Sequence, residues 1–480
     1  MDKNWLYYGD NLDILRRYVK DETIDLVYLD PPFNSNQDYH VLFAEQDGSR
    51  SAAQIQAFKD SWRWDQEAAN AFMEIVEAGG KVSQAMQAFR QMLGANDMLA
   101  YLAMMTPRLV ELQRVLKPTG SIYLHCDPTA SHYLKILMDA IFGVRHFRNE
   151  IIWFYKTGGA SKRHFSRKHD VILFYAKTDD YVFNAQKEKS YMMHEYGFKK
   201  SDFQKDERGQ YTWVYMKDVW EIPSIGSADS QRLGYPTQKP LALLERIIGA
   251  STNPGDVVLD PFCGCGTTID AAQRLERRWI GIDITSIAIN LIKSRLLDTY
   301  GESITKTYLV RGEPTTYSEA LALAEFDKYQ FQWWALGLVG ARGVEEKKGA
   351  DQGIDGRLYF HDEREGGKTK QVIFSVKGGH TSVKDVRDLR GVIEREKAEI
   401  GVLITLQEPT QPMRKEAADA GFYTSPWDGT HPRIQILTVA ELLAGKRIDM
   451  PPTGQVNITF KKAPKNKGIH EQVETLSLPL

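Results

Sequence analysis

The sequence predicts two α/β domains in one chain, and the first is predicted to be built on a doubly wound sheet. Three observations support this prediction. The chain has 480 residues, which is more than one domain usually holds. Apolar strands alternate with amphipathic stretches in its first part, as in an α/β sheet. A second α/β pattern starts near Glu325. We therefore expect domains over residues 1–310 and 322–445, with residues 451–480 as a surface or disordered tail.

Apolar runs mark the expected strands of the first domain. They are Thr23–Asp30, Gly120–Asp127, Glu150–Tyr155, Asp170–Lys177, Asp256–Asp260 and Arg278–Ile284. Helical patterns occur around Leu109–Leu116 and over Thr129–Phe142 and Leu241–Thr252. Residues 51–96 read as a polar helical insertion, and Thr307–Thr316 reads as a domain boundary.

Composition excludes several classes of protein. The formal charge of −2 gives no global sign of nucleic-acid binding, so any DNA contact must come from local basic patches. Cys126, Cys263 and Cys265 are too few for a disulfide framework and indicate a reducing compartment. Cys263 and Cys265 lack a second pair, so we expect no zinc site. The absence of a signal peptide and of a long apolar run predicts a cytoplasmic protein without a membrane partner.

A glycine-rich turn, Asp260–Thr268, follows the strand that ends at Asp260 and precedes a helix. Its glycines allow a tight turn and the close approach of a ligand to the main chain. Asp283 lies about 20 residues further on, where nucleoside-binding units place a ribose-binding acid. The turn lacks the dinucleotide pattern and the lysine of a phosphate loop. S-adenosylmethionine fits instead, with its cationic amino-acid end near Asp260 and its ribose on Asp283. The alternative is an ordinary turn between a strand and a helix.

A second acid, Asp30, ends the strand Thr23–Asp30 and is followed by Pro31, Pro32 and Phe33. A carboxylate and a fixed backbone carbonyl can accept both hydrogens of an exocyclic amine on a base. This favours the tetrahedral nitrogen that attacks a methyl group. The prolines hold the carbonyl rigidly, and Phe33 would stack on a base taken out of the double helix. The alternative is a plain strand-ending turn, which Asp-Pro-Pro commonly makes.

Residues 1 to about 305 resemble the DNA amino-methyltransferases, which modify adenine N6 or cytosine N4. The matching motifs are Gly9–Asn11, Asp30–Phe33, Tyr235–Pro240, Asp260–Thr268 and Asp283. Their order, with the catalytic motif before the cofactor loop, is similar to that of the β class. The resemblance implies the methyltransferase fold, catalysis by Asp30, Pro31, Pro32 and Phe33, and an S-adenosylmethionine site. That site would consist of Asp10, Thr237, Lys239, Pro240, Asp260, Phe262, Gly264, Gly266, Thr267 and Asp283.

Asp30 favours adenine, because cytosine-N4 members more often carry serine there, and cytosine stays the alternative. The substrate is expected to be double-stranded DNA, with RNA and a protein amide as alternatives. A role in restriction–modification or phage defence follows from the resemblance. A homodimer and a separate restriction partner stay open.

The variable region between the two motifs, about residues 155–225, holds target recognition in this class. It contains a basic run, Lys156–Asp170, in which the cationic candidates for DNA binding are Lys162, Arg163, Arg167 and Lys168. Such a patch can bind phosphates and reach a guanine edge. The alternative is a solvated charged loop. Lys187–Asp218, with several tyrosines and lysines, is the other candidate.

Three stretches of the second α/β pattern stand out, namely Gly349–Gly356, Ser375–Gly379 and Asp388–Leu406. With them, this part of the chain resembles the Mrr-like restriction endonuclease domain, of the PD-(D/E)xK fold. The resemblance implies that Asp355 binds Mg²⁺ and that Lys377 is a catalytic residue. Two positions depart from the pattern, because Ser375 replaces an acid or glutamine and Gln332 replaces a glutamate. Glu345 or Glu346 would have to compensate. One hypothesis is therefore a bifunctional enzyme that also cleaves DNA, and the other is a domain that only binds DNA or a partner.

Overall fold

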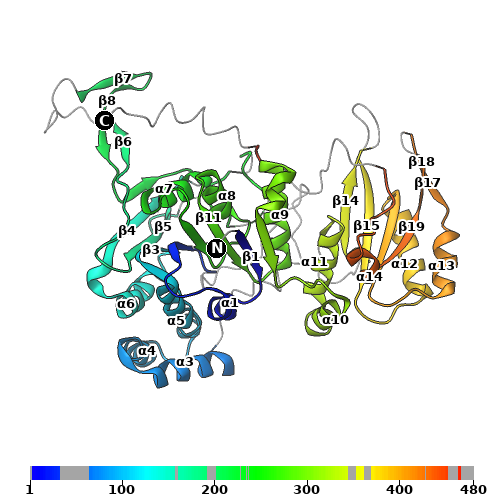
Figure 1. Ribbon diagram of the computed structural model, residues 1–480, viewed down its shortest axis with the longest axis horizontal. Coiled ribbons are helices and arrows are strands. Elements are labelled where there is room, and N and C mark those ends of the chain that lie inside the picture. The colour runs from blue at the N-terminus through cyan, green and yellow to red at the C-terminus, as the bar shows by residue number, and fades with distance from the viewer. Residues whose placement is uncertain are drawn as a thin grey trace.

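The computed structural model shows two α/β bodies side by side, with the first on the left and the second on the right in Figure 1. It describes residues 3–32, 64–156, 161–191, 202–226, 229–233, 235, 237–343, 353–361, 369–426, 429–451 and 463–465. Three residues named above, Phe33, Glu345 and Glu346, lie outside the described residues, as does most of the tail.

The first body contains a mixed sheet, which has nine strands within the described residues. In spatial order these are β12 (Tyr308–Arg311), β1 (Asn4–Tyr8), β11 (Arg278–Asp283), β10 (Val257–Asp260), β2 (Ile24–Leu29), β3 (Leu116–Cys126), β5 (His169–Ala176), β4 (Phe147–Phe154) and β9 (Val219–Glu221). Only β5 among them runs antiparallel to its neighbours. The six expected strands are confirmed. The segment expected as a boundary, Thr307–Thr316, contains β12, which pairs with β1, and the division of the chain into domains stays a prediction.

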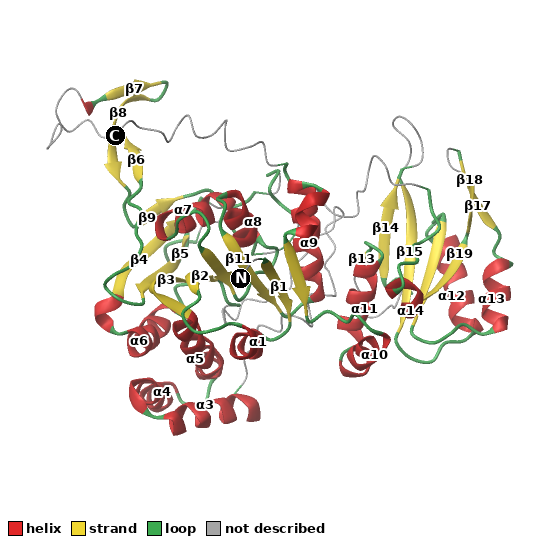
Figure 2. Cartoon of the chain, in the orientation of Figure 1, coloured by secondary structure: helices red, strands yellow, loops and turns green. Residues whose placement is uncertain are grey.

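Helices cover both faces of this sheet (Figure 2). One face carries α1 (Asn11–Tyr18), α5 (Asp97–Val115) and α6 (Ser131–Phe142), and the other carries α7 (Leu241–Ser251), α8 (Thr267–Arg274) and α9 (Ser286–Tyr300). Strand β2 shows why both layers form, because its side chains alternate between them. Val27 and Leu29 join the core under α5, whereas Leu26 and Tyr28 join the core under α7. This is the doubly wound arrangement expected, with one antiparallel strand added.

The expected polar insertion contains two helices, α3 (Gln66–Ala78) and α4 (Gly80–Leu93), which pack against α5. The helix expected around Leu109–Leu116 begins earlier, at Asp97, where the Asn96 side chain accepts a hydrogen bond from the Leu99 amide and caps it. Leu116 itself already belongs to β3.

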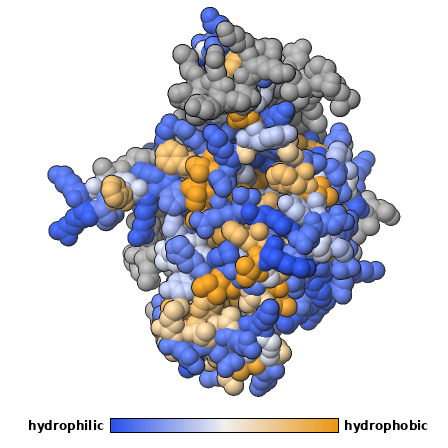
Figure 3. Space-filling view, turned by 90° about the vertical axis from the view of Figure 1, so that its left-hand side faces the viewer, coloured by the Kyte–Doolittle hydropathy of each residue, from blue (hydrophilic) through white to orange (hydrophobic). Residues whose placement is uncertain are grey.

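A three-stranded arm projects from the first body at the upper left of Figure 1. It consists of β6 (Lys187–Ser190), β7 (Gln204–Asp206) and β8 (Gly209–Tyr215). Lys187, Lys189 and Arg208 each lie over a tyrosine ring of the arm. Hydrophilic residues cover most of this end of the molecule, with apolar residues in groups between them (Figure 3).

The second body contains a five-stranded sheet with helices on both faces. Its strands are β13 (Arg342–Gly343), β14 (Gly356–Phe360), β15 (Lys370–Lys377), β16 (Ile400–Thr405) and β19 (Ile434–Thr438). Its helices are α10 (Tyr317–Phe326), α11 (Lys328–Leu338), α12 (Val383–Arg395), α13 (Gln411–Ala418) and α14 (Val439–Leu443), and β17 (Phe422–Ser425) pairs with β18 (Gly429–Pro432). This confirms the second α/β pattern. Across the described part of the chain, no helix combines the length and apolar character needed to span a membrane.

Candidate active site

Four acidic side chains meet at one edge of the large sheet. Asp283 and Asp260 end β11 and β10, Asp30 follows β2 directly, and Asp10 follows β1 after Gly9. These four strands are neighbours and run parallel, so their carboxyl ends lie at the same edge. Ligands of α/β sheets bind at this edge. The structure therefore brings together acids that are up to 273 residues apart in the sequence.

The turn after β10 depends on its glycines. Gly264 has φ +46° and Gly266 has φ +75°, in the left-handed region that favours glycine. A Cβ atom at Gly264 would lie 3.1 Å from the ring of Tyr235, and one at Gly266 would lie 2.7 Å from Ile292. The turn is therefore closely packed from two sides, and a side chain at either position would force it open.

Asp283 is both a binding candidate and a support of this turn. Its carboxylate accepts hydrogen bonds from the Gly264 amide at 2.9 Å and from the amide and hydroxyl of Thr285 at 2.9 and 2.8 Å. Burial raises the pKa of Asp283 to about 6, although these hydrogen bonds lower it. Each carboxylate oxygen can accept two hydrogen bonds, so Oδ1, which accepts both bonds from Thr285, is filled, and a ligand donor would reach Asp283 through Oδ2.

Asp260 lies beside Asp283 and is almost completely buried. Burial raises its pKa to about 7, the Thr268 hydroxyl and the Phe262 amide lower it, and the neighbouring carboxylates raise it. A ligand that brought positive charge or hydrogen-bond donors here would stabilise the ionised form of both acids.

Asp10 is linked to the glycine turn through Asn11 of its own motif and through Arg108, which the sequence did not single out. Its carboxylate caps α1 through the amides of Leu12 and Asp13 and pairs with Arg108 of α5 at 2.5 Å. Arg108 also donates to Asn11 at 2.6 Å, and Asn11 donates to the carbonyl of Pro261 at 2.8 Å. Arg108 lies 98 residues from Asp10 in the chain, so only the fold reveals the pairing.

The acid of the second motif, Asp30, forms an ion pair with Lys239. Lys239 also donates to the carbonyl of Thr237 at 3.3 Å, and Thr237 has φ +51°, which is rare for a β-branched residue. Pro240 is buried at the start of α7. The structure thus places the Tyr235–Pro240 motif against Asp30, 209 residues away in the sequence.

A buried polar chain lies beneath Asp30, and sequence reasoning missed it. The Tyr28 hydroxyl contacts Nδ1 of His125 at 2.9 Å, and Nε2 of His125 contacts Asp170 at 3.1 Å. Tyr155 donates to the other oxygen of Asp170 at 3.0 Å. Burial alone would raise the pKa of Asp170, but the hydrogen bond from His125 lowers it below its usual value. The only sequence signal was a histidine inside an apolar strand.

The basic loop lies at the same sheet edge as Asp30, because it joins the end of β4 to the start of the antiparallel β5. Lys162, Arg163 and Arg167 are exposed, and Lys168 is half-buried. Phe165 between them is fully exposed. Residues 157–160 of this loop lie outside the described residues.

In the second body the structure brings Asp355, Ser375 and Lys377 together. One oxygen of Asp355 accepts from the Val376 amide at 2.6 Å and from the Ser375 hydroxyl at 3.2 Å, and it lies 4.0 Å from the Lys377 ammonium. Gln332 donates to the Asp355 carbonyl at 3.4 Å. No cluster of three metal-ligating side chains occurs among the described residues. These residues do not fit Mg²⁺, since a carboxylate bound by the main chain and one hydroxyl make a poor ligand set.

Comparison with known proteins gives two family matches. The family model for DNA methylases of the N6/N4 type matches residues 24–294, which is more than half of the chain. A second model, NACHT-associated inactive restriction endonuclease 1, matches residues 328–444. The second match gives no support to the cleaving alternative.

Three similar proteins each match part of this chain. Type II methyltransferase M.HpaI of Haemophilus parainfluenzae is 35% identical over 39% of this chain and 57% of its own length. Type II methyltransferase M2.LlaDCHI of Lactococcus lactis subsp. cremoris is 30% identical over 62% of this chain and 91% of its own length. The DNA adenine methyltransferase YhdJ of Escherichia coli is 26% identical over 61% of this chain and 82% of its own length. The chain spans only 57% of M.HpaI and of M.EcaI from Enterobacter cloacae.

Solved structures are more distant. The PvuII cytosine-N4 methyltransferase aligns with 17% identity and a TM-score of 0.40 over 64% of this chain and 92% of its own. The M1.HpyAVI complex with S-adenosylmethionine aligns with 20% identity and a TM-score of 0.34 over 61% of this chain and 99% of its own. The family match, with the sheet order and the acids at its edge, leads to one conclusion. The chain belongs to the N6/N4 DNA methylase family and carries a second domain that resembles an inactive restriction endonuclease.

Proposed function

We propose that this protein methylates N6 of an adenine that is flipped out of duplex DNA, with S-adenosylmethionine as the methyl donor. The biological setting would be restriction–modification or phage defence. The observation that carries this proposal is the pairing of β2 with β10, which sets the Asp30 turn beside the glycine turn. The family match and the names of the similar proteins favour DNA over RNA or a protein amide.

The residues at the sheet edge suit this cofactor. It supplies a methyl group activated on a sulfonium sulfur. The buried carboxylates Asp260 and Asp283 fit a ligand with a cationic amine and ribose hydroxyls, which would compensate their desolvation. Asp10 would contact the adenine ring. Phe262, Gly264, Gly266 and Thr267 would form the turn around the ligand, and Thr237, Lys239 and Pro240 would line its methionine end.

Catalysis would depend mainly on holding the target amine. The Asp30 carboxylate and the backbone carbonyl after it accept the two amine hydrogens, which keeps the nitrogen lone pair directed at the methyl group. Pro31 and Pro32 fix this carbonyl. Phe33 stacks on the flipped base. The nitrogen forms the new bond to carbon, the sulfur keeps the electrons of the broken bond, and one amine proton leaves.

Lys239 gives Asp30 a partner before the base arrives. Asp30 is only partly exposed, and a carboxylate there is costly without a partner, so the ion pair offsets part of this cost in the free enzyme. The incoming amine replaces the ammonium as the hydrogen-bond donor to Asp30. Lys239, in the motif that would line the methionine end, would then hold the carboxylate of the cofactor.

Modified-base sequencing of DNA from cells that express the wild type or Asp30→Ala tests the proposal. We expect N6-methyladenine at one short sequence with the wild type and its loss in the mutant, because the amine then has no acceptor. Asp13→Ala, an exposed acid of α1, is the control and should methylate normally. Marks on cytosine N4 would support the alternative base, and unmarked DNA from the wild type would reject DNA methylation.

For the second domain we propose binding of DNA or a partner rather than cleavage. The engaged Asp355 carboxylate and the match to an inactive endonuclease family support this role. The proposed division of the chain is a methyltransferase over 1–310, with target recognition near 155–225, an endonuclease-like domain over 322–445, and a tail over 451–480. The exposed cations Lys162, Arg163 and Arg167, with Lys168, are the proposed DNA contacts of the recognition region.

A further inference from the structure

The second domain touches the edge where the cofactor is proposed to bind. Gln330, in α11 of the second domain, accepts two hydrogen bonds through its Oε1 atom. The donors are the Tyr8 hydroxyl at 3.3 Å and the Ser286 amide at 3.4 Å. Tyr8 ends β1 two residues before Asp10, and Ser286 starts α9 three residues after Asp283. A single side chain therefore joins the end of β1, which precedes Asp10, to the start of α9, which follows Asp283.

The Gln330 side chain provides an acceptor for the Ser286 amide, a donor at the start of α9. The first amides of a helix have no acceptor within the helix, and the Ser286 amide is one of them. Its acceptor comes from the second domain. The neighbouring backbone groups are already hydrogen-bonded to each other, because the Gly9 amide donates to the Asp283 carbonyl at 2.9 Å. Gln330 thus completes a set of bonds that fixes β1 relative to the start of α9.

The helices α11 and α9 approach each other closely at a glycine. A Cβ atom at Gly337 would lie 2.1 Å from the Asn290 side chain. The helix α11 is also anchored in the second domain, where Phe331 and Trp334 are almost fully buried in its core. A shift of the second domain would therefore move α9 and the residues at its start.

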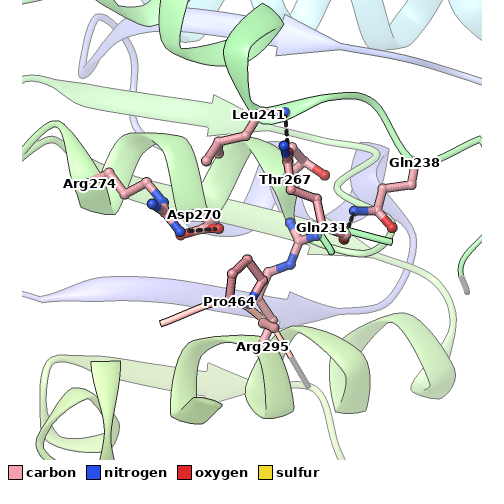
Figure 4. A pocket seen from close by; sticks show the side chains of 9 residues that line it. Gln231, Gln238, Leu241, Thr267, Asp270, Arg274, Arg295 and Pro464 are labelled. Atoms are coloured by element: carbon pink, nitrogen blue, oxygen red, sulfur yellow. Dashed lines mark hydrogen bonds and ion pairs between the residues drawn. The ribbon is translucent and has the colours of Figure 1, made fainter. Parts of the chain in front are cut away.

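A second contact comes from the chain beyond the second domain. Ala463 is 6% exposed and packs with Tyr235, Cys265 and Leu291, and its amide donates to Asp298 at 3.3 Å. Pro464 lines a small cavity with Thr267 and Arg295 (Figure 4). Cys265 belongs to the glycine turn. The start of α9 and the turn are thus each contacted by residues from the C-terminal third of the chain.

We propose that the endonuclease-like domain and the segment 463–465 hold the cofactor site in its binding conformation, with Gln330 as a positioning residue. This inference rests on the proposed function. A site that is already ordered binds its ligand without the cost of ordering it, so loss of these contacts weakens cofactor binding. The methyl transfer itself should not change once the site is filled, because Gln330 does not reach the reacting atoms.

Calorimetric titration of the full-length chain with S-adenosylmethionine tests this. Gln330→Leu removes the acceptor at nearly constant volume, and we expect Kd to rise roughly three- to tenfold, as expected for two long hydrogen bonds. Gln330→Glu keeps the acceptor and should stay closer to the wild type. In methylation assays Gln330→Leu should raise KM for the cofactor and leave kcat unchanged. A general structural defect would lower kcat as well.

The control is Gln332→Leu, two residues along α11, because Gln332 faces Asp355 of its own domain. Its Kd should match the wild type. Ala463→Arg tests the second contact independently and should also raise Kd. If Gln330→Leu and Ala463→Arg both bind like the wild type while Asp283→Ala loses binding, positioning by the second domain is wrong and the cofactor site stands. If the wild type does not bind S-adenosylmethionine, both proposals fall.

Discussion

At the scale of residues, the sequence identifies acids but not their environment. Asp260 and Asp283 are predicted from a turn and a spacing, and the structure adds that burial raises their pKa to about 7 and about 6. The direction in which pH changes stability follows from the difference in proton binding between the folded and unfolded states. The folded apo protein binds protons here more readily than the unfolded chain, so these groups make unfolding easier as pH rises from about 4 to 7. The affinity for a ligand that needs the ionised acids should instead rise with pH over this range.

Binding of S-adenosylmethionine should therefore weaken as pH falls below about 6. Protonated Asp283 loses acceptor capacity for the ribose hydroxyls, and affinity should then fall by up to about tenfold per pH unit. Titration calorimetry between about pH 5 and about pH 8 measures this change in affinity. Asp283→Asn should bind S-adenosylmethionine weakly at every pH and should lose the part of the pH dependence that comes from Asp283. A wild-type affinity that is constant down to about pH 5 would contradict the role of Asp283.

At the scale of elements, the order of strands decides which motifs meet. The turn after β10 and the turn after β2 are distant in the sequence, yet they adjoin because the two strands pair. The same rule places the loop between β4 and β5 at this edge, since β5 is antiparallel. A charged run that could have been a solvated loop thus lies beside the proposed site for a flipped base.

Replacement of Lys162, Arg163 and Arg167 by alanine should weaken DNA binding. Each phosphate contact that is lost should reduce the slope of log K against log salt by about 1. Fluorescence anisotropy with duplex DNA over a series of salt concentrations measures both effects. Lys20→Ala is the matched control, because this exposed lysine precedes β2 at the opposite edge of the sheet. An unchanged slope in the triple variant would show that the loop does not bind phosphates.

At the scale of the whole molecule, local motifs were predictable and distant partners were not. The strands, the glycine turn and the Asp30 turn are each encoded within a few neighbouring residues. Arg108, His125 and Gln330 contact groups that are 44 to 322 residues away, and no periodicity in the sequence marks such pairs. Phe33 lies outside the described residues, so its stacking role stays a prediction. In the second domain the acid and lysine of the motif meet, but the described residues add no group of metal-ligating side chains around them.

Asp355→Ala separates the two roles considered for the second domain. If Asp355 acts as a structural acceptor, its loss leaves the Val376 amide without a partner and should lower stability by about 1–3 kcal/mol. Thermal unfolding of the full chain measures this, and Lys377→Ala, whose ammonium lies 4.0 Å from the carboxylate, should cost less. Neither variant should change cleavage of unmodified duplex DNA in the presence of Mg²⁺, because the wild type itself should not cleave. Cleavage by the wild type that both variants abolish would restore the bifunctional enzyme.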